Sequence, residues 1–163
     1  YLQSRDLKPL GRYFPELVEG LQKALRGPAV LDGEVVIMGE RGLEFETLQL
    51  RIHPAESRVK MLAAQTPSAF VAFDMLGDGG DDLLGTPFGE RRARLEKYCH
   101  AAKPPLYITP ATYSAETAQD WFDRFEGAGF DGVRRYIPAG KARDAEDQAP
   151  AHGRLRGGRL SLE

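Results

Sequence analysis

The sequence predicts a mixed α/β domain in which one sheet is flanked by helices. Segments with helical periodicity alternate with short strand-like segments as far as about residue 133, and the apolar run Ala69–Leu76 suits a strand in the core of a sheet. The chain has 163 residues, which fits one domain of roughly 100 to 200 residues. No repeat or linker divides residues 1–133, so we expect one domain there, with a separate tail over 134–163.

The first half of the chain predicts a helix, a strand and a second short helix. Phe14 to Leu25 reads as an amphipathic helix, because Pro15 suits its first turn and Gly27-Pro28 stops it. Its apolar stripe consists of Leu17, Val18, Leu21 and Leu25. Ala29 to Met38 comes next as a strand, and a turn over Gly39 to Gly42 leads to a short helix over Glu44 to Leu50.

The second half predicts two strands and two helices, and the start of another strand. The strand Ala69–Leu76 ends in a turn over Gly77 to Asp82, and Thr86 caps a charged helix that runs to about His100. A short strand over Leu106 to Thr109 precedes a helix capped by Ser114. The apolar stripe of that helix consists of Ala118, Trp121, Phe122 and Phe125, and a final strand begins over Phe130 to Val133.

Composition argues against several classes of protein. The net charge of −2 lacks the strong basic excess that is typical of a stand-alone DNA-binding module. The single cysteine, Cys99, excludes an intrachain disulfide and a multi-cysteine metal site, which favours the reducing cytoplasm. No apolar run reaches the roughly 18 residues that a membrane helix needs, and the first residues lack a signal-peptide pattern. We therefore expect a cytoplasmic monomer without a membrane segment.

The strand around Asp32-Gly33-Glu34 is the most informative segment. A carboxylate that loses water without gaining a partner costs several kcal/mol, so both acids should face a solvated cleft, a cation or a ligand hydroxyl. Gly33 lets another backbone or a ligand approach closely. The alternative is a surface strand with alternating polar residues.

Three further elements accompany this segment in a characteristic order. Ser4-Arg5 precedes it, and Phe73-Asp74-Met75-Leu76 and then Asp131-Gly132-Val133 come after it. In this order the four elements resemble the nucleotidyltransferase (adenylation) domain of ATP-dependent DNA ligases, especially the compact bacterial end-joining ligases. The resemblance covers about residues 1 to 133, and it implies an ATP-grasp-like fold, here without its first strands, and therefore marginal stability.

The same resemblance implies roles for individual residues. ATP would be bound by Arg5, which suits a phosphate, by Glu34, which binds the ribose or a metal, and by Phe73, which stacks on adenine. Mg²⁺ would be held by Glu34 and Asp131, because hard oxygen ligands suit this ion. Supporting acids would be Asp32 and Asp74, while the histidines His53, His100 and His152 are expected as surface residues. The arginines Arg91, Arg92 and Arg94 are expected to form a solvated helix face.

Two elements of the ligase family have no counterpart in this sequence. The family's nucleophilic lysine stands in Lys-x-Asp-Gly, and no lysine here is followed by x-Asp-Gly, whether Lys8, Lys23, Lys60, Lys97, Lys103 or Lys141. In place of the family's Val-Ala-Lys and Lys-x-Lys elements, the chain has Arg134-Arg135-Tyr136-Ile137-Pro138. We expect a partial chain that contains no catalytic residue and is inactive by itself.

The tail over 134–163 is rich in Arg, Ala, Gly, Pro and Asp. It has too few large aliphatic residues for a core, which predicts disorder. A sharper hypothesis is an out-of-frame product, because the codons for 144–159 permit, one base later, a reading that resembles the missing Lys-x-Lys element. A natural basic, flexible tail is the competing interpretation.

Three functions are compatible with these observations. The first is a fragment of an ATP-dependent DNA ligase, which would use ATP and Mg²⁺ and whose full-length relatives would seal nicked or broken double-stranded DNA in repair and recombination. The second is an RNA ligase or a capping guanylyltransferase, since these enzymes share the nucleophilic lysine and the Asp-Gly-Glu element with the DNA ligases. The third is a non-catalytic remnant that binds a nucleotide or a partner. The sequence between the motifs resembles that of the DNA ligases and favours the first function.

Overall fold

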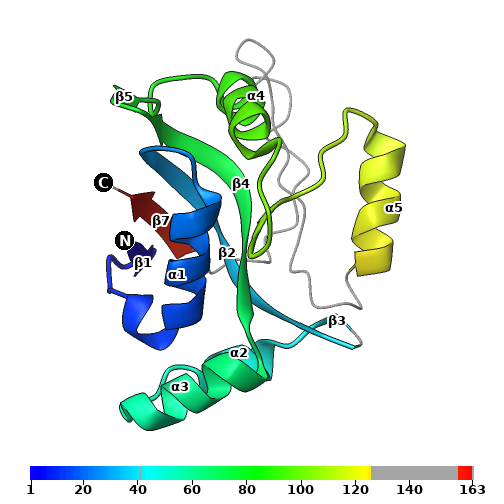
Figure 1. Cartoon of the computed structure of the whole chain (residues 1–163). Coiled ribbons are helices and arrows are strands. Elements are labelled where there is room, and N and C mark those ends of the chain that lie inside the picture. The colour runs from blue at the N-terminus through cyan, green and yellow to red at the C-terminus, as the bar shows by residue number, and fades with distance from the viewer. Residues whose placement is uncertain (41, 126–157, 163) are drawn as a thin grey trace.

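The computed structural model describes residues 1–40, 42–125 and 158–162 (Figure 1). Its centre is a sheet of seven strands in the order β1-β7-β2-β4-β5, with β3 paired to β2 and β6 paired to β4. Their bounds are Leu2–Ser4 for β1, Ala29–Gly39 for β2, Gly42–Leu43 for β3, Ser68–Asp78 for β4, Asp81–Asp82 for β5, Leu106–Ile108 for β6 and Gly158–Leu162 for β7. Among these described strands only the β4–β6 pairing is parallel, so the sheet is mixed, as the sequence predicts.

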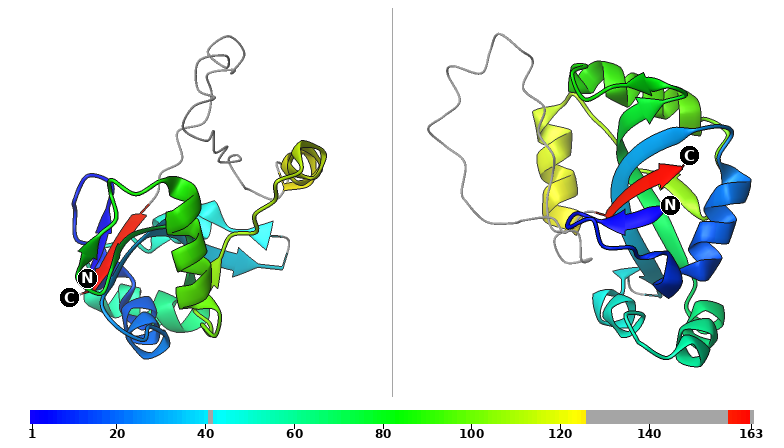
Figure 2. Two further views of the ribbon diagram at one scale, coloured as in Figure 1. Left: turned by 90° about the horizontal axis from the view of Figure 1, so that it is seen from above. Right: turned by 90° about the vertical axis from the view of Figure 1, so that its left-hand side faces the viewer.

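Five α-helices and a short 3-10 helix are described around this sheet. They are α1 (Pro15–Ala24), α2 (Phe45–Leu50), α3 (Glu56–Gln65), α4 (Phe88–Cys99) and α5 (Ala115–Phe125), with the 3-10 turn over Gly11–Tyr13. Viewed from the side, α1 lies on one side of the sheet and α5 on the other (Figure 2). The mixed architecture with flanking helices is therefore confirmed.

The hydrophobic core lies between the sheet and helices α1 and α4. Alternate residues of β2 and β4 supply one wall, and the helices supply the other. The fully buried members include Leu17 and Leu21 of α1, Leu31 of β2, Phe70 and Met75 of β4, and Leu95 of α4. The apolar stripe that predicts α1 thus faces the core, as an amphipathic helix requires.

The helix predictions are mostly confirmed, with two differences. Helix α3 was not predicted, because its apolar residues do not form a continuous stripe, and only Val59 and Ala63 of this helix are buried. Thr86 does not cap α4, because the N-cap position directly before the first helical residue, Phe88, is occupied by Pro87. Ser114 does cap α5, because its hydroxyl accepts a hydrogen bond from the backbone N–H of Thr117 at 3.1 Å.

The end of the chain differs from the expected tail. Residues Gly158–Leu162 form strand β7 between β1 and β2, with Leu160 in register with both Leu2 and Leu31. Backbone pairing on both sides supplies an order that composition does not reveal. The predicted strand over 130–133 and the remaining tail residues, 134–157 and 163, lie outside the described residues.

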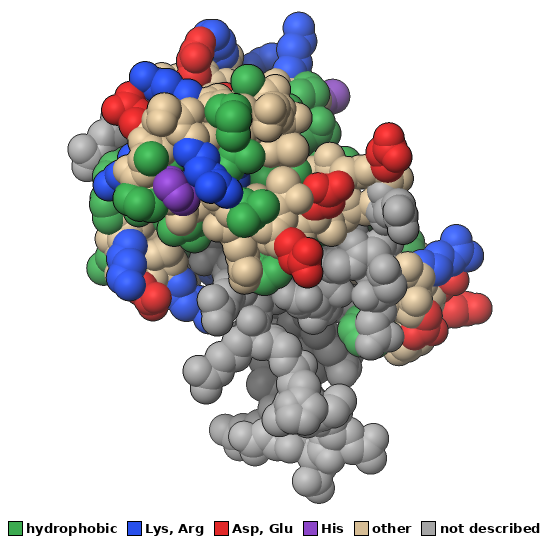
Figure 3. All heavy atoms as spheres, turned by 90° about the horizontal axis from the view of Figure 1, so that it is seen from below, with side chains coloured by type: hydrophobic (Ala, Val, Ile, Leu, Met, Phe, Trp, Pro, Cys, Tyr) green, Lys and Arg blue, Asp and Glu red, His purple; other side chains and the backbone are tan. Residues whose placement is uncertain are grey.

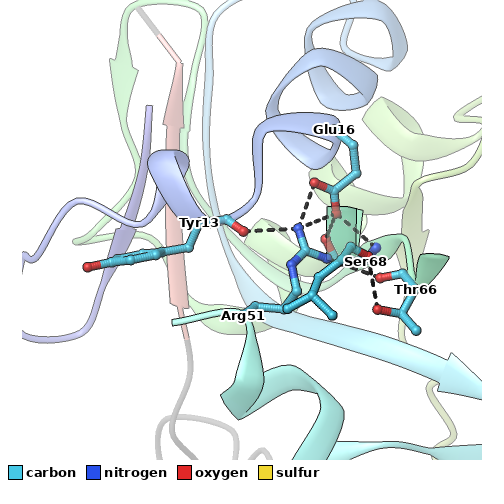
Figure 4. A network of polar contacts seen from close by, with 6 residues as sticks. Tyr13, Glu16, Arg51, Thr66 and Ser68 are labelled. Atoms are coloured by element: carbon cyan, nitrogen blue, oxygen red, sulfur yellow. Dashed lines mark hydrogen bonds and ion pairs between the residues drawn. The ribbon is translucent and has the colours of Figure 1, made fainter. Parts of the chain in front are cut away.

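Arg51 is the largest fully buried side chain of the described residues, and it joins four elements (Figure 4). Its Nη2 donates to both carboxylate oxygens of Glu16 at 2.8 Å and to the carbonyl of Tyr13 at 2.9 Å. Its Nη1 donates to the carbonyl of Thr66 at 3.0 Å, and Glu16 also accepts from the Ser68 hydroxyl at 2.8 Å. The network fastens α1 to the ends of α2 and α3 and to the start of β4.

The α2–α3 end of the molecule carries exposed apolar residues. They are Met38, Phe45, Leu50, Ile52 and Met61. Seen from below, hydrophobic side chains are scattered among charged ones at this end (Figure 3). Scattered apolar residues are normal on a protein surface, so they indicate no docking site by themselves. No helix within the described ranges is long and apolar enough to cross a membrane.

Candidate functional site

The Asp-Gly-Glu segment lies in the middle of β2, next to β4. Leu31, Gly33 and Val35 are buried and point toward the core, while Asp32 and Glu34 alternate with them and are half-buried. The structure therefore places both carboxylates on the sheet face that is turned away from α1. This agrees with the requirement that they avoid the apolar core.

Gly33 is required by the packing of a neighbouring ring. A Cβ atom at this position would lie 2.6 Å from Cζ of Phe70 and 2.6 Å from the carbonyl oxygen of Val71. Both distances are too short for a real contact, so only glycine fits. The close approach that the sequence predicts is thus made by the protein's own Phe70.

Phe73 lies in an irregular part of β4. Gly33 is in register with Ala72 and Asp32 with Asp74, so one step along β2 corresponds to two steps along β4, and Phe73 is the inserted residue of a bulge. Such a bulge locally changes the twist and the aim of side chains. Phe73 comes directly after the buried Ala72 and is half-buried itself, beside the Asp32–Gly33 step of β2.

Asp74 is a structural acid, which is one of its predicted roles. Its side chain is 4 % exposed and forms an ion pair with Arg91 of α4, which donates from Nε at 2.9 Å and from Nη2 at 2.7 Å. The prediction of a solvated arginine face on α4 is wrong for Arg91 and also for Arg92, which donates to the Thr109 carbonyl at 2.6 Å. Periodicity could not reveal these partners, because they lie 17 residues away from the arginines.

Arg5 comes directly after β1 and is exposed. Ser4 pairs with Gly158, and Gly158 pairs with Gly33, so Ser4 and Gly33 lie in line across β7. Strands β1 and β2 are both antiparallel to β7 and run in the same direction. Ser4 and Gly33 are thus two strand spacings or roughly 10 Å apart, and Arg5, in the turn after β1, and Glu34 each follow one of them directly.

The residues predicted for the ATP site come from three segments of the sheet region. Glu34 of β2 is the Cα partner of Val71, Phe73 lies in the β4 bulge beside the Asp32–Gly33 step, and Arg5 lies in the turn after β1. Asp131 lies outside the described residues. Within the described part of the chain, no group of three His, Cys, Asp or Glu side chains could hold a metal ion. The sequence did not predict that Arg91 binds Asp74 in this region. The only signal for this contact was the position of Arg91 on the helix that follows the Phe-Asp element.

Comparisons with known proteins identify the family of the chain. The family model described as "ATP dependent DNA ligase domain" matches residues 1–134. DNA ligase C2 of Mycolicibacterium smegmatis is 55% identical over 132 residues, which cover 81% of this chain and 37% of that relative. DNA ligase C of Mycobacterium tuberculosis is 52% identical over 136 residues, which cover 81% of this chain and 38% of the relative.

A solved structure supports the same conclusion. The ligase domain of M. tuberculosis LigD matches with a TM-score of 0.54 and 27% identity, over 84% of this chain and 43% of that one. The chain thus spans less than half the length of the relatives and of the solved domain that it matches. Its four ordered motifs, its mixed sheet and these matches agree, and the chain belongs to the family of ATP-dependent DNA ligase domains.

Proposed function

We propose that Arg5, Glu34 and Phe73 bind ATP. The observation that carries the proposal is that the strand pairing brings the three segments together around Gly33, although they are far apart in the sequence: Glu34 follows Gly33, Phe73 lies in the bulge beside it, and Arg5 follows Ser4, which is in line with it across β7. A guanidinium suits the phosphates, a carboxylate suits the ribose hydroxyls or a metal, and a flat ring suits adenine. ATP use is a property of the family to which the chain belongs.

The donor set also suits Mg²⁺. Asp32 and Glu34 are hard oxygen donors two residues apart on the same face of β2, and this is the ligand type that Mg²⁺ prefers. We assign the ion to Glu34 and Asp131, with Asp32 in support. A bound Mg²⁺ would neutralise phosphate charge, while the protein's own residues bind and orient the nucleotide.

At the level of the whole protein, we propose an ATP-dependent DNA ligase that seals nicked or broken double-stranded DNA. The relatives are named DNA ligases, which favours this function over an RNA ligase or a capping enzyme. None of the 163 residues is a lysine followed by x-Asp-Gly, so the chain by itself should form no lysine–AMP adduct. A monomeric state and a cytoplasmic location remain predictions.

Direct titration with ATP in the presence of Mg²⁺ tests the nucleotide site. We expect weak binding, which Glu34→Gln lowers about tenfold or more, because a hydrogen bond to a charged group is lost. Glu40→Gln is the matched control, because Glu40 is exposed just beyond the end of the same strand and its replacement removes the same charge. Absence of binding at millimolar ATP, or equal losses in the two variants, would overturn the proposal and favour a non-binding remnant.

A further inference from the structure

Arg91 holds Asp74 by an unusually complete set of contacts. Two of its nitrogens, Nε and Nη2, donate to the two carboxylate oxygens of Asp74 at 2.9 and 2.7 Å, and Nη1 donates to the Thr86 carbonyl at 2.5 Å. The guanidinium also lies 5.7 Å from the centre of the Phe88 ring. Arg91 is therefore held by the loop before α4 as well as by β4, and it can act as a rigid support.

Asp74, which Arg91 binds, lies directly after the bulge residue Phe73 on β4. Asp74 is the residue of β4 at which the register with β2 resumes after the inserted Phe73, and its neighbour across the ladder is Asp32. A bulge disrupts the ladder locally, so the backbone there is held less firmly than in a regular strand. The contacts of the Asp74 side chain therefore help to decide where the adjacent Phe73 is aimed.

The register of Asp74 with Asp32 makes the arginine more important. Like charges directly opposite one another on neighbouring strands are destabilising. Arg91 compensates the buried carboxylate of Asp74, whose side chain is 4 % exposed and could not rely on water for this purpose. Without Arg91 the carboxylate would keep the hydrogen bond from the Met75 backbone N–H, at 2.8 Å, but would lose its counter-charge at the position next to Phe73.

We propose that Arg91 is a positioning residue that fixes Phe73 for contact with the adenine of ATP. The inference rests on the proposed function, because it assumes that Phe73 contacts the base. Arginine is specific here, since its planar fork donates to both carboxylate oxygens at once, and a lysine ammonium cannot reproduce that geometry. The arginine itself touches neither the nucleotide nor the reacting atoms.

The experiment compares the affinity for ATP with that for inorganic triphosphate, which lacks the base. Phe73→Leu should weaken ATP binding about two- to tenfold and leave triphosphate binding unchanged, because only stacking is lost. Arg91→Lys should reproduce this pattern, and it should add nothing in the Phe73→Leu background. The matched control is Arg92→Lys, because Arg92 is about equally buried on the same helix but holds Thr109 instead of Asp74.

The outcomes separate this inference from the proposed function. If Phe73→Leu does not weaken ATP binding, Phe73 does not contact adenine and both proposals fail. If Phe73→Leu weakens ATP binding but Arg91→Lys behaves like the Arg92→Lys control, only the positioning role is wrong. Equal losses of ATP and triphosphate affinity in Arg91→Lys would show a general structural effect and would also overturn it.

A second variant guards against a failure of Arg91→Lys to fold, which circular dichroism would detect. Asp74→Asn combined with Arg91→Gln keeps the volume of residue 74, shortens residue 91 and removes both charges, so no buried charge is left uncompensated by the substitution. The neutral pair loses the two-point, charge-assisted clamp. We expect the same selective loss of ATP affinity, and normal ATP affinity in this folded double variant would contradict the inference.

Discussion

Replacing Glu16 by alanine should destabilise the protein strongly, because it isolates a buried charge. The Arg51 side chain is 0 % exposed and its ion-pair partner Glu16 is 23 % exposed. Without the carboxylate, the guanidinium keeps only the carbonyl oxygens of Tyr13 and Thr66 as hydrogen-bond acceptors among the described residues. A buried cation with no counter-charge cannot regain its hydration, so its penalty falls on the folded state.

The magnitude depends on the burial of the two partners. Breaking a buried ion pair costs about 3–5 kcal/mol, and the partial exposure of Glu16 favours the lower end, about 3 kcal/mol. In a protein of 150–250 residues each kcal/mol lowers the melting temperature by about 2–4 °C, so we expect a fall of about 6–12 °C. Loss of the acceptor for the Ser68 hydroxyl acts in the same direction.

Thermal melts followed by circular dichroism measure this effect. Glu19→Ala is the control, because Glu19 lies on the same helix but its ion pair with Lys23 is exposed, so its melting temperature should stay near that of the parent. Glu16→Ala combined with Arg51→Met should recover part of the loss, since the isolated charge is then gone. Equal melting temperatures for the Glu16 and Glu19 variants would refute the reasoning.

Three further predictions concern packing, ionisation and strand order. Gly33→Ala should cost about 1–3 kcal/mol in chemical unfolding, because its Cβ would overlap a ring and a carbonyl, whereas Gly80→Ala meets nothing within 4 Å and should change little. Burial raises the pKa of Cys99, so its thiol is kept neutral. The folded state therefore keeps its full stability with respect to this thiol below the unfolded-state pKa, and loses it as the pH rises above that value toward the folded-state pKa. Because the thiolate is the reactive form, native protein should react with iodoacetamide far more slowly than unfolded protein at about pH 8. Gln3 and Arg159 are Cα partners of β1 and β7, so cysteines at both positions should form a disulfide on mild oxidation, and failure to cross-link would contradict the place of β7.

The origin of the tail is decided at the level of the DNA. The hypothesis of a shifted reading frame predicts that the gene encodes the Lys-x-Lys element one base out of frame over 144–159. Sequencing the DNA that encodes the chain in all frames would reveal that element if the hypothesis is correct. A gene without it would support a natural tail, of which Gly158–Leu162 is the strand β7.

Much of the fold could be predicted because the relevant information is local. The stripe of Leu17 and Leu21 predicts α1, and the apolar run from Ala69 predicts β4, since burial of one face imposes a period on the sequence. The family could be predicted as well, because its four motifs keep their order along the chain and their recognition needs no knowledge of contacts.

Contacts between distant segments could not be predicted from these patterns. Arg51 reads as an ordinary arginine after a short helix, and Arg91 reads as part of a solvated face, because periodicity says nothing about partners 35 and 17 residues away. The strand β7 was missed for the same reason, since its order comes from backbone pairing with β1 and β2 and requires no apolar core of its own. Local sequence thus defined the elements and the family, while the tertiary structure decided the counter-charges of the buried arginines and the strand that lies between β1 and β2, because both depend on contacts between distant segments.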